Sequence, residues 1–144
     1  MAELLLIARL GGRRIAFPAS KVEAVVELEG ITPAPCAASH VAGLSALRSR
    51  VLTVIDGLAA LGLGRAALAD GRDAIVVPCD GHTYALIVEE VEDVVEADGP
   101  RAPIAAPLGA GWDRVAIGTV EVESELFLLV DPHLLIAGPA ANAA

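Results

Sequence analysis

The sequence repeats itself, and this repeat constrains the fold more than any other feature. Residues 7–30 align without a gap over residues 76–99, and eight of the 24 columns are identical. Residues 43–56 align over residues 118–131, at an offset of 75 instead of 69. A unit of roughly 60–70 residues is too long for a solenoid repeat and suits a duplicated small barrel or lobe. We therefore expect two lobes of similar structure.

Within each copy, short segments rich in valine, isoleucine and leucine alternate with turn residues. Gly11-Gly12 and Asp80-Gly81 stand at equivalent places, and both dipeptides accept the positive φ of a tight hairpin turn. Short strands separated by turns predict an all-β chain. Each copy is expected to end in a short helical stretch, at 57–61 and at 132–136.

The repeat also sets the expected domain organisation. Residues 1–144 form a single domain, with lobe one over about 4–62 and lobe two over about 73–137. The last residues, 138–144, are rich in alanine and are expected to be a frayed tail. Because the apolar runs are far shorter than a membrane span and the N-terminus does not read as a signal peptide, we expect a cytoplasmic protein that is not inserted in a membrane.

Composition argues against several classes of function. A net charge of −9 repels nucleic acid, and only 3% of the residues are aromatic, which leaves no platform for stacking bases. Cys36 and Cys79 lack zinc spacing and are expected to be buried free thiols. The three histidines are scattered, so neither a metal nor a cofactor is expected. The acidic run at 89–93 is better explained as a solvated face than as catalytic carboxylates, and no enzyme is predicted.

The two copies differ most in the charge of one turn. Arg48-Ser49-Arg50 in the first copy aligns with Glu123-Ser124-Glu125 in the second. One interpretation is a solubilising hairpin tip. The other is an exposed arginine that anchors a protein partner, because arginine binds carboxylates in a fork and is frequent at interface hot spots. Apolar neighbours could form a groove beside the charge or simply belong to the core: Val41, Leu44, Leu47, Val51 and Val54.

At these residues the chain resembles the CheW family of bacterial chemotaxis adaptors. Residues 43–56, GLSALRSRVLTVID, are similar to the family run G-x-x-x-L-R-G-x-x-x-P-V-x-D. Arg14–Pro18 and Val22–Val25 resemble two of its early segments. Ala85–Val91 resembles its g-l-l-V-D-x-V segment, and Gly118–Leu135 resembles its closing segment.

The resemblance implies a fold and a function. The fold would be two SH3-like, five-stranded β-barrel lobes packed together, with short helices. The function would be a non-catalytic scaffold that couples the cytoplasmic tip of a chemoreceptor to the regulatory domain of a histidine kinase. In this family the receptor tip lies in the groove between the lobes, and the kinase domain, itself of this fold, meets the adaptor end to end.

The resemblance also implies contact residues. Arg48 matches the arginine of the L-R-G run and is the expected receptor anchor; the other expected receptor contacts are Arg50, Val22, Ala24 and Leu47. We expect the kinase contact at Leu86 and Val88, on the assumption that they form an exposed barrel end.

The chain departs from the family pattern at four positions: Ser49, Ala46, Thr53 and Ala24. A serine at positive φ costs about 1 kcal/mol or more, so we expect this turn to be built differently from one that contains glycine.

A second class of function remains open on the residues alone. The cleft between the lobes could bind a small ligand, as in a sensor barrel. An open apolar strip beside Arg48 would favour the scaffold, whereas a closed concave site would favour the ligand. A hydrolase that uses the acidic run at 89–93 is a third hypothesis.

Overall fold

The computed structural model describes residues 3–28, 30–33, 38–66 and 72–138. Cys36 and the tail residues 139–144, for which we made predictions, lie outside the described residues. Four short helices lie in the described part: η1 (Ala19–Lys21), α1 (Gly57–Leu61), α2 (Ala110–Val115) and α3 (Pro132–Ala137). The strands are β1 (Leu4–Leu10), β2 (Arg13–Pro18), β3 (Ala24–Leu28), β4 (Val41–Leu47), β5 (Arg50–Asp56), β6 (Arg72–Cys79), β7 (His82–Ile87), β8 (Glu90–Glu96), β9 (Ala116–Val122) and β10 (Glu125–Val130).

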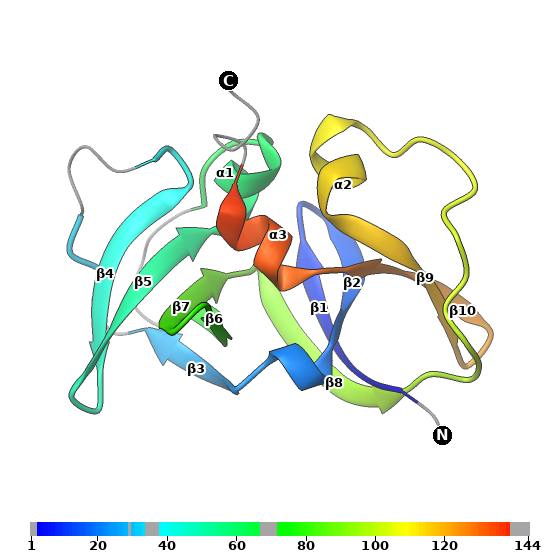
Figure 1. Ribbon diagram of the computed structural model, residues 1–144, viewed down its shortest axis with the longest axis horizontal. Coiled ribbons are helices and arrows are strands. Elements are labelled where there is room, and N and C mark those ends of the chain that lie inside the picture. The colour runs from blue at the N-terminus through cyan, green and yellow to red at the C-terminus, as the bar shows by residue number, and fades with distance from the viewer. Residues whose placement is uncertain (1–2, 29, 34–37, 67–71, 139–144) are drawn as a thin grey trace.

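The strands form two five-stranded sheets that stand side by side (Figure 1). The first sheet has the order β8-β1-β2-β10-β9, and the second has the order β3-β6-β7-β5-β4. Strands β2 and β10 run parallel, as do β5 and β7, while the other neighbours are antiparallel. The expected all-β fold with two five-stranded units is confirmed.

Each sheet contains strands from both sequence copies. The alignment makes β1 to β5 the counterparts of β6 to β10, so both sheets have the same strand order, but the hairpins β1-β2 and β6-β7 have changed places. The prediction of one lobe from 4–62 and the other from 73–137 is therefore wrong. The repeat shows which strands are equivalent, but it carries no information on which copy supplies the central hairpin of each sheet.

A backbone bridge joins the two edges of each sheet. Thr32, which follows β3, pairs with Leu44 of β4, and its counterpart Ala102, which follows β8, pairs with Thr119 of β9. A side chain at Gly43 would collide with the carbonyl of Thr32, so glycine is needed where the closing segment crosses the strand. These bridges curl both sheets into a barrel-like form.

The turns and helix starts follow the sequence prediction. Gly12 and Gly81 both lie at positive φ, at 75° and 83°, in equivalent two-residue hairpin turns. Asp56 accepts hydrogen bonds from the backbone of Leu58 and Ala59 at the start of α1. Asp131 caps α3 in the same way. The helix α2 was not predicted, because its start at Gly109 carries no side-chain cap.

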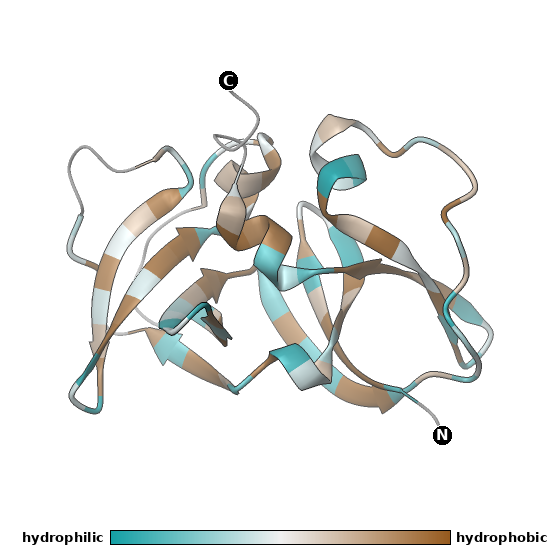
Figure 2. Cartoon of the chain, in the orientation of Figure 1, coloured by the Kyte–Doolittle hydropathy of each residue, from teal (hydrophilic) through white to brown (hydrophobic). Residues whose placement is uncertain are grey.

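The two sheets share a central cluster of buried apolar side chains. We use this name for Leu6, Ala8, Leu10, Ile15, Phe17, Ile55, Ala60, Leu61, Ile75, Val77, Leu86, Val88, Trp112, Val115, Leu128, Val130, Leu135 and Ile136. The first sheet has a smaller cluster of its own around Leu5 and Phe127, and the second has one around Leu52 and Ile87. Figure 2 shows hydrophobic bands along these strands and hydrophilic turns between them.

The exchanged hairpins predict how the chain responds to being divided between its copies. Residues 1–66 and 67–144, expressed separately, should each lack a cooperative thermal transition, because neither half contains a complete sheet. Mixing the halves should restore one transition, followed by circular dichroism. A cooperative transition in either half alone would contradict the exchange.

Candidate interaction surface

The turn between β4 and β5, which we call the basic turn (Arg48–Arg50), is exposed and left-handed. Arg48 has φ 50° and Ser49 has φ 72°. Ser49 thus adopts a positive φ, which glycine adopts without strain, so the serine does not prevent a left-handed turn here. Its counterpart Ser124 does so too, with φ 68°. The turn holds Arg48 away from the sheet, exposed to solvent.

An ion pair ties the basic turn to the start of β3. Arg50 Nη2 lies 2.6 Å from Glu23 Oε2, and both side chains are exposed, at 48% and 40%. Glu23 immediately precedes Ala24, which is exposed. The structure thus brings Arg50 close to Ala24, as the resemblance implies. Arg50 is already bound in an ion pair within the chain. Arg48 has no ion pair among the described residues.

The two apolar residues expected at the receptor contact are only partly accessible. Val22 is half-buried and packs against the central cluster. Leu47 is half-buried and packs against the second sheet's own cluster. Of the residues expected at the receptor contact, the exposed ones are Arg48, Arg50 and Ala24.

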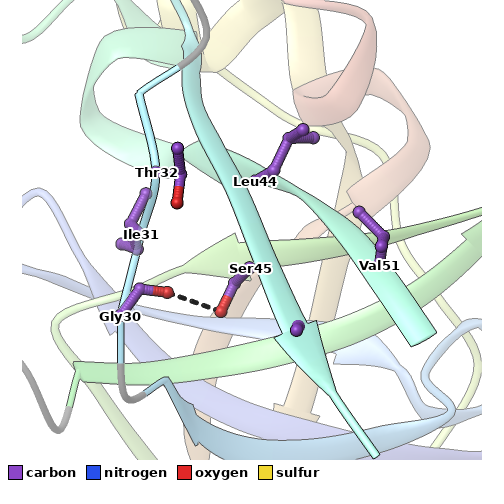
Figure 3. Close-up of a pocket in the computed structure, with 7 residues that line it drawn as sticks. Gly30, Ile31, Thr32, Leu44, Ser45 and Val51 are labelled. Atoms are coloured by element: carbon purple, nitrogen blue, oxygen red, sulfur yellow. Dashed lines mark hydrogen bonds between the residues drawn. The ribbon is translucent and has the colours of Figure 1, made fainter. Parts of the chain in front are cut away.

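Beside the basic turn lies an open groove, which we call the hairpin groove. Its volume is about 670 Å³, and it is lined by Gly30, Ile31, Thr32, Leu44, Ser45, Ala46 and Val51. Figure 3 shows the 30–32 segment running beside β4, where the Ser45 hydroxyl donates a 2.6 Å hydrogen bond to the Gly30 carbonyl. Ala46 pairs with Val51 next to the Leu47–Arg50 pair, so the groove reaches the basic turn.

The hairpin groove resolves the two interpretations of the apolar residues around Arg48. Val51 is 67% exposed and Leu44 is 42% exposed, so both belong to the groove. Val54 is fully buried, and Val41 packs partly against the central cluster. Side chains two residues apart in a strand lie on the same face, so the polar Thr53 shares a face of β5 with Val51. The polarity of Thr53 was therefore the sequence signal that Val51 faces outward.

The equivalent turn of the first sheet, which we call the acidic turn (Glu123–Glu125), is braced differently. Arg14 lies 2.9 Å from a Glu92 carboxylate oxygen and 2.7 Å from one of Glu125, and it sits over the Phe127 ring. The hydrogen bond to Glu92 is the main cause of a raised pKa for Arg14, which therefore stays charged. Arg14 is thus one of the residues that line a polar hollow beside this turn.

The prediction of an exposed kinase contact at Leu86 and Val88 is wrong. Leu86 is fully buried and Val88 is 1% exposed. Strand β7 lies in the middle of its sheet, so Leu86 and Val88 face the central cluster while Ala85 and Ile87 face the sheet's own cluster. The apolar run at 85–88 was predicted to form an exposed barrel end, but it is a strand buried on both faces.

Comparison with known proteins assigns the fold to a family. A family model described as "CheW-like domain" matches residues 4–139. The chain belongs to the CheW-like domain family. The "Chemotaxis protein CheW" of Rhizobium meliloti (strain 1021) is 30% identical over 132 residues, which cover 84% of this chain and 85% of that protein. The crystal structure of "scaffolding protein TtCheW" from Thermoanaerobacter tengcongensis has a TM-score of 0.80 at 21% identity, over 94% of this chain and 92% of that one.

This membership confirms the resemblance found in the sequence. CheW-like proteins are non-catalytic scaffolds of chemotaxis signalling, and the chain is an adaptor of this kind. In the described part of the chain, no three His, Cys, Asp or Glu side chains gather in a way that could hold a metal ion. Cys79 is a half-buried free thiol. Among the described helices, none has the length and apolar character needed to cross a membrane.

The burial of Leu86 leads to a stability prediction. Leu86→Ala should lower the free energy of unfolding by about 2–5 kcal/mol, because it opens a cavity between the sheets. Val51→Ala, the matched control at an exposed apolar position, should change it by less than about 0.5 kcal/mol. Urea titration of both variants measures the difference. Equal losses would mean that Leu86 is not a core residue.

Proposed function

We propose that the chain couples the cytoplasmic tip of a chemoreceptor to the regulatory domain of a histidine kinase, in the cytoplasm beside membrane receptors. The observation that carries the proposal is an exposed arginine next to an open apolar groove, on a fold whose relatives are chemotaxis scaffolds. An open groove offers contact along a protein segment, whereas small-molecule sites enclose most of their ligand.

Arg48 is the receptor anchor in this proposal. Its guanidinium is exposed and has no ion pair within the described residues, so it can bind a carboxylate or a helix-end carbonyl of the receptor tip without breaking an existing contact. Arg50 must first leave Glu23, 2.6 Å away, and therefore contributes less. Ala24 is also exposed, but its methyl side chain can make no polar contact, so the polar contacts with the receptor come from the two arginines.

The kinase contact must fall on exposed surface. Leu86 and Val88 cannot supply it while the sheets are packed. By family resemblance the kinase regulatory domain has this same fold and meets the adaptor at a barrel end. The barrel ends at the basic and the acidic turn each expose a large apolar side chain, Val51 and Leu126.

No specific observation favours the alternative hypothesis of a small-ligand site. The space between the sheets is filled by the central cluster, and the hairpin groove opens to solvent on the outer side of the second sheet. The groove beside Arg48 is therefore not the groove between the lobes that the resemblance implies for the receptor tip.

Purification of the tagged chain from its native cells tests the proposal. A histidine kinase and a chemoreceptor should co-purify with the wild-type chain. The Arg48→Ala variant should retain the kinase and lose most of the receptor, while Arg65→Ala, a change at another exposed arginine, should retain both. Recovery of neither partner with the wild-type chain would contradict the proposed function.

The arginine anchor also predicts binding energies. Arg48→Ala should weaken binding to a receptor-tip fragment about 30-fold, or about 2 kcal/mol, since a central arginine anchor contributes that much. Arg50→Ala should cost less, because Arg50 must give up its ion pair with Glu23 before it can bind the receptor. Calorimetry measures affinity, with Arg65→Ala as control and thermal melting as a check of folding. Equal, small losses of receptor affinity for Arg48→Ala and Arg65→Ala would mean that Arg48 is a charge at the rim of the interface and not an anchor.

A further inference from the structure

His40 is a buried histidine at a position where the second copy of the repeat has an apolar residue. At the offset of 75 it aligns with Val115. The two positions are equivalent in the fold, because the N–H of Asp56 donates to the His40 carbonyl at 2.8 Å and the N–H of Asp131 donates to the Val115 carbonyl at 3.1 Å. Val115 is fully buried and His40 is 5% exposed. The first copy thus places a titratable ring where the second copy places a valine.

The His40 ring holds the end of the last helix, α3. Its Nε2 lies 2.7 Å from the Ile136 carbonyl oxygen, and because a carbonyl can only accept, Nε2 carries the proton and Nδ1 is the bare nitrogen of a neutral ring. Nδ1 is buried and has no hydrogen-bond partner among the described residues. The backbone of Gly138 packs on the ring so closely that any side chain there would collide with it. We call this contact the histidine latch.

Two charged side chains flank the histidine latch. From α2, the Arg114 guanidinium donates to the Leu134 carbonyl at 3.0 Å, so a fixed positive charge already lies at the last turn of α3 and opposes a second one. From the end of β5, Asp56 would favour a positive ring, but its carboxylate oxygens already accept three backbone N–H groups. Neither Asp56 nor any other carboxylate of the described chain accepts a hydrogen bond from His40 Nδ1.

The remaining titratable groups on the elements around the latch are engaged elsewhere. On α3, the His133 ring contacts the Pro78 carbonyl at 3.1 Å, and Asp131, which caps the helix, pairs with Lys21 at 2.9 Å. Strand β4 and helix α1 carry no titratable side chain. A proton on Nδ1 of His40 would therefore find neither an acceptor nor a counter-charge.

We propose that the histidine latch is a pH switch, closed while the His40 ring is neutral and opened when the ring takes up a second proton. A buried N–H without an acceptor is unfavourable, so the protonated ring must leave the site to find water. Histidine is the side chain that changes its charge between about pH 8 and pH 5. Because the open state binds the proton and the closed state does not, the closed latch is favoured at the upper end of this range and lost as the pH falls. Opening frees the end of α3 from the start of β4, the strand that leads to the basic turn.

This inference goes beyond the proposed function and does not depend on it. The test uses the purified chain alone, without a receptor or a kinase. A latch that stays closed at every pH would overturn the switch and leave the proposed function intact.

Nuclear magnetic resonance of the whole chain between about pH 8 and pH 5 is the test. The ring signals of His40 report its protonation, and the Gly138 amide, which donates to the Leu134 carbonyl at 3.3 Å, reports the latch through its protection against hydrogen exchange. This protection, corrected for the intrinsic pH dependence of exchange, should fall by up to about tenfold per pH unit, since one proton is taken up on opening. The fall should follow the protonation of the His40 ring.

Three variants separate the switch from a merely structural histidine. His40→Gln keeps an N–H for the Ile136 carbonyl but does not titrate, so the protection of Gly138 should stay high at every pH. His40→Val, which installs the residue of the second copy, removes the latch and should leave this protection low at every pH. His82→Gln, the same change at an exposed histidine, should behave as wild type.

Three outcomes would each overturn the proposal. The first is a His40 ring that becomes protonated while Gly138 keeps its protection. The second is a His40→Gln or His40→Val variant with the pH dependence of the wild type. The third is a His40 ring that stays neutral down to about pH 5, the lower end of the range in which histidine titrates.

Discussion

Apolar side chains from both sheets meet in the central cluster, and the positions of all the surfaces described above depend on this packing. Leu10 and Phe17 arrive from the first sheet, and Leu86 and Val88 arrive from the second. Each fully buried side chain of this size contributes roughly 1.5–3 kcal/mol of hydrophobic stabilisation. Because the hairpins β1-β2 and β6-β7 have exchanged sheets, neither sheet can form without residues from both copies. The basic turn and the acidic turn are thereby held at fixed places on one folded unit.

Duplication supplied two equivalent frameworks, and small changes on their surfaces made them different. The turn geometry is the same in both copies, down to the positive φ of Ser49 and Ser124. What differs is charge and polarity, with Arg48 opposite Glu123 and Leu44 opposite Thr119. A scaffold needs surfaces that its partners can tell apart, and sign of charge is an effective discriminator because like-charge contacts are strongly unfavourable. The two copies therefore share their strand order and turn geometry and differ in the charge and polarity of these surfaces.

The sequence predicted local structure well because local structure depends on neighbouring residues. Gly12 and Gly81 mark their turns, and Asp56 and Asp131 mark their helix starts, through contacts within a few residues. The exposed Arg48 was predictable in the same way, from its place in a two-residue turn.

Long-range arrangement was not predictable, for physical reasons. Exchanging two equivalent hairpins leaves the pattern of apolar residues unchanged, so the pattern cannot reveal it. Leu86 and Val88 were misplaced because a strand buried on both faces shows no alternation. The hairpin groove depends on Thr32 crossing β4 at Gly43, a contact between segments distant in sequence.

The central claim is that one copy of this chain binds a chemoreceptor tip and a kinase regulatory domain at the same time. The most direct measurement immobilises the receptor fragment and follows capture of the purified kinase domain, with and without the chain, by a surface-binding assay. Our account predicts that the kinase domain is captured only when the chain is present and that capture saturates as the chain fills the receptor. Capture that does not require the chain, or displacement of the chain from the receptor by the kinase domain, would contradict it.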